Sequence, residues 1–129
     1  MKHMSKKDLL KDAVPVKGSM SFTIGGETIS TTKVYVGPNN VLAGVTDDPG
    51  GQETVLGMRF STLKKPGKYD IDENVLIGAY PHGGNSTSVV RGTLSLKEID
   101  VDELRYNGGF EGFTEDGISA EGKFEMRRM

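Results

Sequence analysis

Acidic side chains occur as close pairs along this sequence of 129 residues, and paired carboxylates facing a cleft are the groups that hydrolyse glycosides. The pairs are Asp47 with Asp48, Asp70 with Asp72, Asp100 with Asp102, and Glu115 with Asp116. Each pair lies in or beside a stretch typical of a turn, where an Asp side chain stabilises the local backbone. The sequence also contains no Trp to stack on a sugar ring. We therefore expect turn residues at these positions, and a carboxylate-dependent hydrolase is the third of three functional alternatives.

Calcium is another ligand that clustered carboxylates can hold. Asp47 and Asp48 lie in one segment rich in oxygen ligands, and Asp100 and Asp102 lie in a second. Calcium needs about six to eight oxygen ligands in an arranged loop, and neither segment has the spacing of an EF-hand. We expect no metal and no other cofactor, and these four residues are the candidates if calcium binds.

Nucleophiles and metal ligands of other kinds are scarce. The chain has no Cys and two His, which excludes disulfides, thiolate metal sites and cysteine nucleophiles. His82 stands between Pro81 and Gly83 with no second ligand near it in the sequence, and no Gly-x-Ser-x-Gly motif is present. We therefore expect no enzyme activity. His82, in an exposed loop, and Tyr80 are candidates for contact with a partner or ligand.

Alternating apolar and polar residues from Ser19 onwards predict β-strands as the elements that position these side chains. The clearest alternation, in the last strand, places five residues on one side: Ile118, Ala120, Gly122, Phe124 and Met126. Gly25-Gly26 and Asp116-Gly117 are typical of tight hairpins. The sequence thus predicts an all-β fold of eight or nine mostly antiparallel strands, as a β-sandwich or a small barrel, and the sandwich is the preferred interpretation.

Glycine is unusually common, with 18 residues, about twice its average share. Six glycines fall inside the expected strands: Gly44, Gly57, Gly92, Gly109, Gly112 and Gly122. Glycine within a strand usually marks a bulge, a bend or the close approach of two backbones. These positions therefore indicate strongly curved sheets.

The first 18 residues differ from the rest of the chain. Residues 1–3 have the composition of a cloning remnant ahead of a natural start at Met4. Residues 5–12 predict a short helix that ends before Pro15. We expect residues 1–18 to be this remnant, helix and linker, followed by a single all-β domain over residues 19–129.

Phe110 and Phe113 are three residues apart, so a regular strand cannot place both rings on one face. We expect one ring to point outward, unless a bulge at Gly112 changes the register. An exposed ring beside Tyr106 would anchor a protein partner or line a ligand pocket. These residues favour a non-enzymatic binding or assembly module that acts through protein–protein contacts, self-association included. The alternative is a calycin-like barrel that carries a small apolar ligand.

The formal net charge is −2, from 16 basic and 18 acidic residues. The closest basic groupings are pairs such as Lys64-Lys65 and Arg127-Arg128, too few for the counterion release that nucleic-acid binding needs. No apolar stretch approaches the ~20 residues that cross a bilayer, and the first residues contain no signal sequence. We expect a cytoplasmic protein without membrane insertion, with an exported mature form as the alternative.

Three glycine-containing motifs follow one another in the C-terminal half: Gly92-Thr93-Leu94-Ser95-Leu96, Gly108-Gly109-Phe110 and Gly122-Lys123-Phe124. Lys65-Pro66-Gly67-Lys68-Tyr69 stands upstream of them. This order resembles small bacterial all-β domains of uncharacterised function, some of which are exported lipoproteins. The resemblance spans residues 19–126 and implies the fold class without an activity. Because the chain has no Cys for a lipid anchor, the resemblance implies no location.

Overall fold

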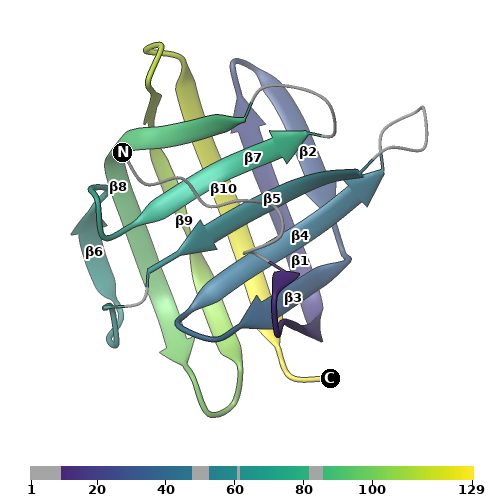
Figure 1. The fold of residues 1–129 in the computed structure, drawn as a ribbon. Helices are drawn as coiled ribbons and strands as arrows, with labels where there is room; N and C mark the ends of the chain where they lie inside the picture. The colour runs from purple at the N-terminus through teal and green to yellow at the C-terminus, as the bar shows by residue number, and fades with distance from the viewer. Residues whose placement is uncertain (1–9, 48–52, 61, 82–85) are drawn as a thin grey trace.

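The computed structural model describes residues 10–47, 53–60, 62–81 and 86–129, which form ten β-strands in one antiparallel sheet (Figure 1). The strands are β1 (Val14–Ile24), β2 (Glu27–Thr31), β3 (Val34–Gly37), β4 (Val41–Asp47), β5 (Glu53–Arg59), β6 (Gly67–Asp70), β7 (Leu76–Pro81), β8 (Thr87–Asp100), β9 (Arg105–Thr114) and β10 (Ser119–Arg127). The predicted all-β class is therefore confirmed.

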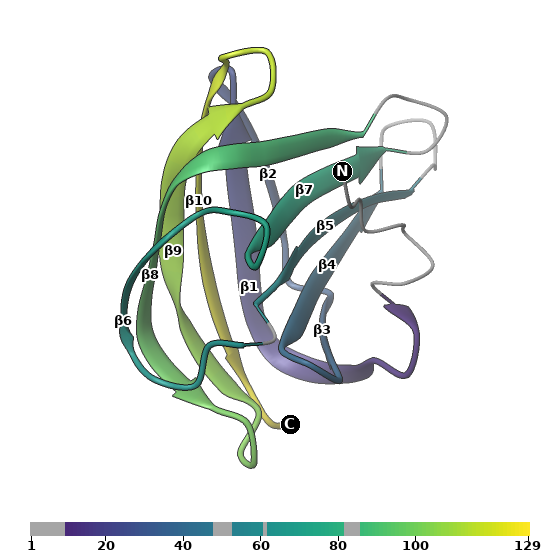
Figure 2. The ribbon, with the colours of Figure 1, turned by 60° about the vertical axis from the view of Figure 1, so that its left-hand side comes forward.

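Eight of the strands form a closed barrel, because the sheet returns to the strand from which it starts. In ring order they are β1, β3, β4, β5, β7, β8, β9 and β10, and β10 pairs with β1. Two extra strands lie outside this ring. β2 pairs with the same edge of β1 as β3 does, and β6 pairs with the same edge of β8 as β7 does. Figure 2 shows the ring from the side, with β8, β9 and β10 curving along one wall. Neighbours in the ring follow one another along the chain, so the barrel is an up-and-down meander.

The preference for a sandwich was wrong, and the barrel alternative is the correct architecture. A sandwich keeps two sheets apart. Here eight consecutive residue pairs, from Lys17 with Arg127 to Ile24 with Ala120, join the first strand to the last. The strand count is ten, rather than eight or nine, because residues 27–36, a single run rich in Thr, Ile, Val and Tyr, contribute to two strands, β2 and β3.

The N-terminal helix expected over residues 5–12 lies mostly outside the described residues. From residue 11 onwards, apart from the gaps given above, the described chain forms strands, turns and loops without a helix. Leu10 is followed by a turn in which the Ala13 N–H donates to the Leu10 carbonyl at 3.3 Å. β1 then begins at Val14, so the strand starts before Ser19, where the alternation becomes visible in the sequence.

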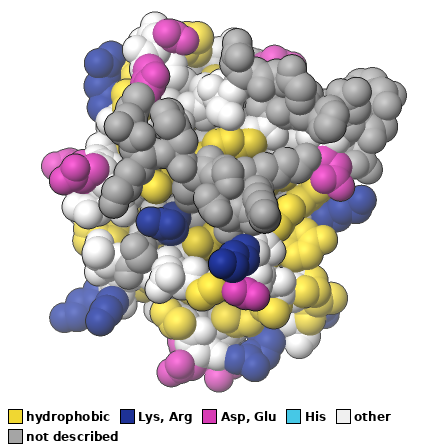
Figure 3. Space-filling view, viewed as in Figure 1, with side chains coloured by type: hydrophobic (Ala, Val, Ile, Leu, Met, Phe, Trp, Pro, Cys, Tyr) yellow, Lys and Arg dark blue, Asp and Glu magenta, His cyan; other side chains and the backbone are white. Residues whose placement is uncertain are grey.

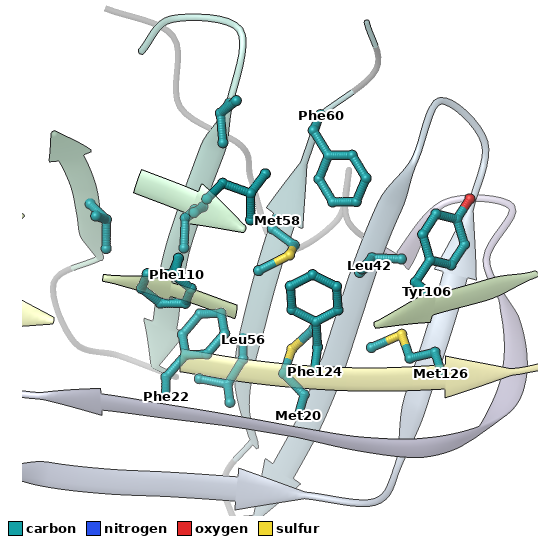
Figure 4. Packing of buried hydrophobic residues seen from close by; sticks show 14 of the residues in the cluster. Met20, Phe22, Leu42, Leu56, Met58, Phe60, Tyr106, Phe110, Phe124 and Met126 are labelled. Carbon is teal, nitrogen blue, oxygen red and sulfur yellow. The ribbon is translucent and has the colours of Figure 1, made fainter. Parts of the chain in front are cut away.

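Large apolar side chains fill the barrel interior (Figure 4). Those that are less than 2% exposed are Tyr106, Phe22, Phe60, Met20, Leu42, Leu56, Met58, Ile77, Leu94, Met126 and Val34. Phe22 packs edge-on against Phe110, with ring centroids 4.9 Å apart, and Phe60 lies 6.1 Å from Tyr106 in the same manner. Burial of this apolar surface is the main favourable contribution to folding.

The alternation predicted for the last strand is confirmed in β10, where Ala120, Gly122, Phe124 and Met126 are buried and the residues between them are exposed. Ile118 is the exception to the predicted inward row. It precedes the first residue of β10, Ser119, and is exposed because it belongs to the hairpin turn rather than to the strand.

A second apolar cluster lies on the outward side of β4, β5 and β7. It contains Val41, Ala43, Val45, Val55 and Tyr80, with Leu10, Tyr35 and Leu76 packed against it. β4 is apolar on both faces, since Leu42 belongs to the interior cluster while Val41 and Ala43 belong to the outer one. This wall of the barrel therefore has apolar packing on both of its sides.

A substitution at Gly122 on β10 tests the interior packing, because the Phe110 ring occupies the space that a Cβ at this position would need. We predict that Gly122→Ala lowers the free energy of unfolding by about 1–3 kcal/mol through overpacking. The matched control is Gly37→Ala, where the nearest atom to a new Cβ is Val41 Cβ at 3.5 Å. This control should change stability by less than about 1 kcal/mol. Urea unfolding measures both values, and equal effects would contradict the packing described.

Candidate functional site

Phe113 and Ile118 form an exposed apolar patch at one end of the barrel. Phe113 lies on the outward side of β9 and is 44% exposed, and Ile118, in the turn between β9 and β10, is 43% exposed. The Arg91 guanidinium, on the neighbouring strand β8, lies over the Phe113 ring, 5.2 Å from its centroid. This distance is typical of a cation–π contact. Arg91, Phe113 and Ile118 are called the Phe113 patch below.

The spacing of the two phenylalanines on β9 decides which ring is exposed. Phe110 faces the interior and is buried, so Phe113, at an odd spacing from it, faces outward. The pairing of β9 with β10 continues without interruption through Gly112, which lies opposite Ala120. The register shifts occur in the pairing of β9 with β8 instead, next to Val89 and next to Leu96.

Hydrogen bonds fix the hairpin that carries the Phe113 patch. The Thr114 N–H donates to the Ile118 carbonyl at 2.9 Å, and the Gly117 N–H donates to the Thr114 carbonyl at 3.0 Å. The Ile118 N–H also donates to the Thr114 hydroxyl at 3.2 Å. In the turn between β1 and β2, the Gly25 N–H donates to the Ser119 carbonyl at 3.0 Å. This bond connects that turn to the first residue of β10.

Tyr106 lies at the opposite end of β9 from Phe113, so the exposed Phe113 ring is not beside Tyr106 as the sequence predicts. It is 1% exposed, and its hydroxyl donates to the Asn40 side-chain oxygen at 2.9 Å. The Asn40 amide in turn donates to the carbonyls of Phe60, at 3.3 Å, and Leu63, at 2.9 Å. One buried side chain therefore ties the β3–β4 turn to β9 and to the segment that follows β5.

The environment of Tyr106 changes its acidity. Burial, and secondarily the negative charge of Asp100, raise the pKa of the Tyr106 hydroxyl to about 12. The phenol is therefore neutral at physiological pH and acts as a hydrogen-bond donor to Asn40 rather than as a base.

A hollow of about 510 Å³ opens at the same end of the barrel as Tyr106. Its lining comes from four segments: Asp12 and Val14, the residues of the β3–β4 turn from Val36 to Asn40, Lys64, and Val101, Leu104 and Tyr106 around the β8–β9 turn. We call it the barrel-mouth hollow. It combines apolar walls with one acidic and one basic side chain.

Two further aromatic candidates are buried away from both sites. Tyr80 is buried in the outer cluster, beside Val55 of β5, so it is not an exposed contact residue. Phe110 is buried inside the barrel. His82 lies outside the described residues.

Two of the acidic candidates stabilise turns. Asp72 accepts a hydrogen bond from the Asn74 N–H at 2.8 Å, and Asp100 accepts one from the Glu103 N–H at 3.2 Å. Such bonds from an Asp side chain to a nearby backbone N–H are the ordinary role of Asp in connections between strands.

The calcium candidates Asp48 and, for its side chain, Asp47 lie outside the described part of the chain. Asp102 is exposed in the β8–β9 turn, two residues after Asp100. Where the structure describes the chain, no three or more His, Cys, Asp or Glu side chains come together as metal ligands would.

Comparison with protein-family models, with curated proteins and with solved structures finds no match to this chain. The resemblance to small bacterial all-β domains therefore stays a prediction. The described residues also contain no helix long and apolar enough to cross a membrane. Any assignment of function rests on the geometry of the Phe113 patch and the barrel-mouth hollow.

The Tyr106 hydroxyl can be removed with little change in shape. We predict that Tyr106→Phe lowers the free energy of unfolding by about 1–3 kcal/mol, because it leaves the buried Asn40 oxygen without a donor. Tyr69→Phe is the matched control, since the Tyr69 hydroxyl donates to the Lys65 carbonyl at 2.5 Å in an exposed position. Denaturant unfolding of both variants should show a clearly smaller loss for the control.

The raised pKa of Tyr106 also predicts a pH dependence. Its unfolded value is 10.0 and its folded value about 12, so between these pH values the folded protein binds more protons than the unfolded chain. The stabilisation from the neutral phenol is complete below pH 10 and is lost as the pH rises to about 12. Over this range, the free energy of unfolding should fall less steeply with pH for Tyr106→Phe than for the unmodified protein. An equal pH dependence in the two proteins would contradict the raised pKa of Tyr106.

Proposed function

We propose that this protein is a non-enzymatic binding module that contacts a protein partner through the Phe113 patch. The observation that carries the proposal is the exposure of Phe113 beside Arg91. The protein has a filled core, yet it leaves a large aromatic ring at its surface with a guanidinium stacked on it. Aromatic and Arg side chains dominate the binding energy of protein interfaces.

The hairpin favours binding because it holds the patch in one conformation. Phe113 belongs to a strand paired on both sides, by β8 and β10, and Ile118 is held by the hydrogen bonds of the turn. Little backbone freedom remains to be lost when a partner covers the patch. Preorganisation of this kind increases affinity without adding contacts.

The charges around the patch favour a partner with a basic rim. Glu111 precedes Phe113 on the same face of β9, and Glu115 and Asp116 lie in the adjoining turn, all three exposed. Opposite charges across an interface speed association and disfavour incorrect partners. We therefore propose a partner that offers an apolar pocket surrounded by Lys or Arg.

Self-association through this surface is less favourable. Two copies facing each other across the patch would bring their acidic rims together, and like charges oppose such a contact. Open strand edges are another common route to self-association. In the closed ring every strand has a neighbour on each side, and among the described strands the outer edges of β2 and β6 have no partner strand.

A capture experiment tests the proposal. The protein is immobilised and exposed to a lysate of cells that naturally produce it, the captured protein is identified, and its affinity is measured with purified components. We predict that Phe113→Ser weakens this affinity at least about tenfold, the size of effect expected for an interface hot spot.

The matched control is Val101→Ser. Val101 is also apolar and is 54% exposed, and it lies at the opposite end of the barrel. This control should bind as the unmodified protein does, and thermal unfolding should show that both variants fold. Equal binding by the two variants, or no specific capture by the unmodified protein, would contradict the proposed surface.

A further inference from the structure

Apolar side chains gather at the barrel-mouth hollow, at the end of the barrel opposite the Phe113 patch. Val14 is 46% exposed and Val101 is 54% exposed, and the hollow also takes part of its wall from Val36 and Leu104. Figure 3 shows hydrophobic side chains at the surface over the lower part of the barrel, near β3 and the start of β4. We propose that this hollow binds a small uncharged apolar molecule.

The interior of the barrel does not offer this space. A carrier of the kind considered from the sequence holds its ligand inside the barrel, where here Phe22, Met58 and Phe124 are among the side chains that pack the centre. The hollow instead lies outside this packed layer, and its base is formed by its most buried lining residues, Tyr106, Val36 and Asn40. Its volume of about 510 Å³ is within the range of about 300–1,000 Å³ typical of small-molecule sites.

The base of the hollow favours an apolar group over a polar one. The Asn40 amide already donates to two carbonyls, and its oxygen accepts the Tyr106 hydroxyl hydrogen bond. No hydrogen bond has to be supplied by the ligand at this depth. A polar ligand group placed there would lose its hydration without compensation, which is unfavourable.

The charges at the rim favour a ligand without net charge. Asp12 and Lys64 are the two ionisable side chains with opposite charges in the lining, and both are exposed. Their charges cancel, so neither an anionic nor a cationic head group gains a net attraction on entering the hollow. The walls of Val, Leu and Pro then provide the main favourable contribution.

Leu104 shows how the wall is held in place. It has a backbone φ of 51°, in the left-handed region that costs a residue with a Cβ about 1–2 kcal/mol. Its half-buried side chain packs against the interior cluster, and this contact offsets the strain. The turn therefore presents an apolar side chain at a position where Gly or Asn is usual, and the wall exists before a ligand binds.

Titration with 1-octanol, followed by amide chemical shifts, tests the proposal on the whole protein. We predict saturable binding with a Kd below about 1 mM, the affinity expected for a ligand of this size in an apolar site. The shifted amides should be those of Val14, Asn39, Val101 and Leu104. Octanoate and octylamine, which carry opposite charges on the same chain, should bind at least about tenfold more weakly.

Two variants at exposed positions keep the test independent of folding. Val101→Asp and Val14→Asp should each weaken octanol binding at least about tenfold, because a charge replaces an apolar wall. Phe113→Ser, at the far end of the barrel, should leave it unchanged. Non-saturable shifts, shifts centred on the Phe113 patch, or tighter binding of octanoate or octylamine would overturn the proposal. Since its site and its ligand differ from those of the protein contact, either proposal can fail alone.

Discussion

The ladder between β1 and β10 is the contact on which the rest of the structure depends. β1 pairs with β3 along one edge, over Val14 to Val16, and with β10 along its other edge from Lys17 onwards, so the ladder with β10 begins beside Gly18. Gly18 has a φ of 140°, and a Cβ there would overlap the Glu125 carbonyl. Only glycine allows the two backbones to approach in this way. The glycine-rich composition is thus connected directly to closure of the barrel.

Closure determines where the protein can act. Because the ring is closed and its interior is packed, both proposed binding sites lie outside the barrel interior, one at each end. β9 connects these ends, since Tyr106 lies near its start and Phe113 near its finish. At one end the buried side chains of Tyr106 and Asn40 bond to each other, and the barrel-mouth hollow combines exposed apolar side chains with one acidic and one basic group. At the other end, the Phe113 ring and the Arg91 guanidinium lie close to exposed acidic side chains. We therefore propose different classes of partner for the two ends.

Local patterns in the sequence predict much of this arrangement. The alternation from Ala120 to Met126 predicts β10, and the spacing of Phe110 and Phe113 predicts that one ring faces outward. Closure itself is not predicted, because a sandwich and an up-and-down barrel share the same alternation and differ only in the pairing of distant strands. The glycine positions indicate curvature without showing which strands meet.

Contacts between distant segments account for what the sequence does not reveal. The Tyr106–Asn40 hydrogen bond joins residues 66 positions apart, and no local pattern marks Asn40 as a buried residue. The barrel-mouth hollow draws on four separate segments for the same reason. The outer cluster does have a local signal: Val41, Leu42 and Ala43 are consecutive apolar residues, the pattern of a strand buried on both faces.

Nuclear Overhauser contacts between β1 and β10 test the closed barrel most directly. A closed barrel predicts cross-strand contacts between backbone protons of Met20 and Phe124, and between those of Ser21 and Lys123, which are directly opposite each other in the ladder. If β1 shows contacts with β2 and β3 alone, while β10 shows contacts only with β9, the ring is open and the barrel is not closed.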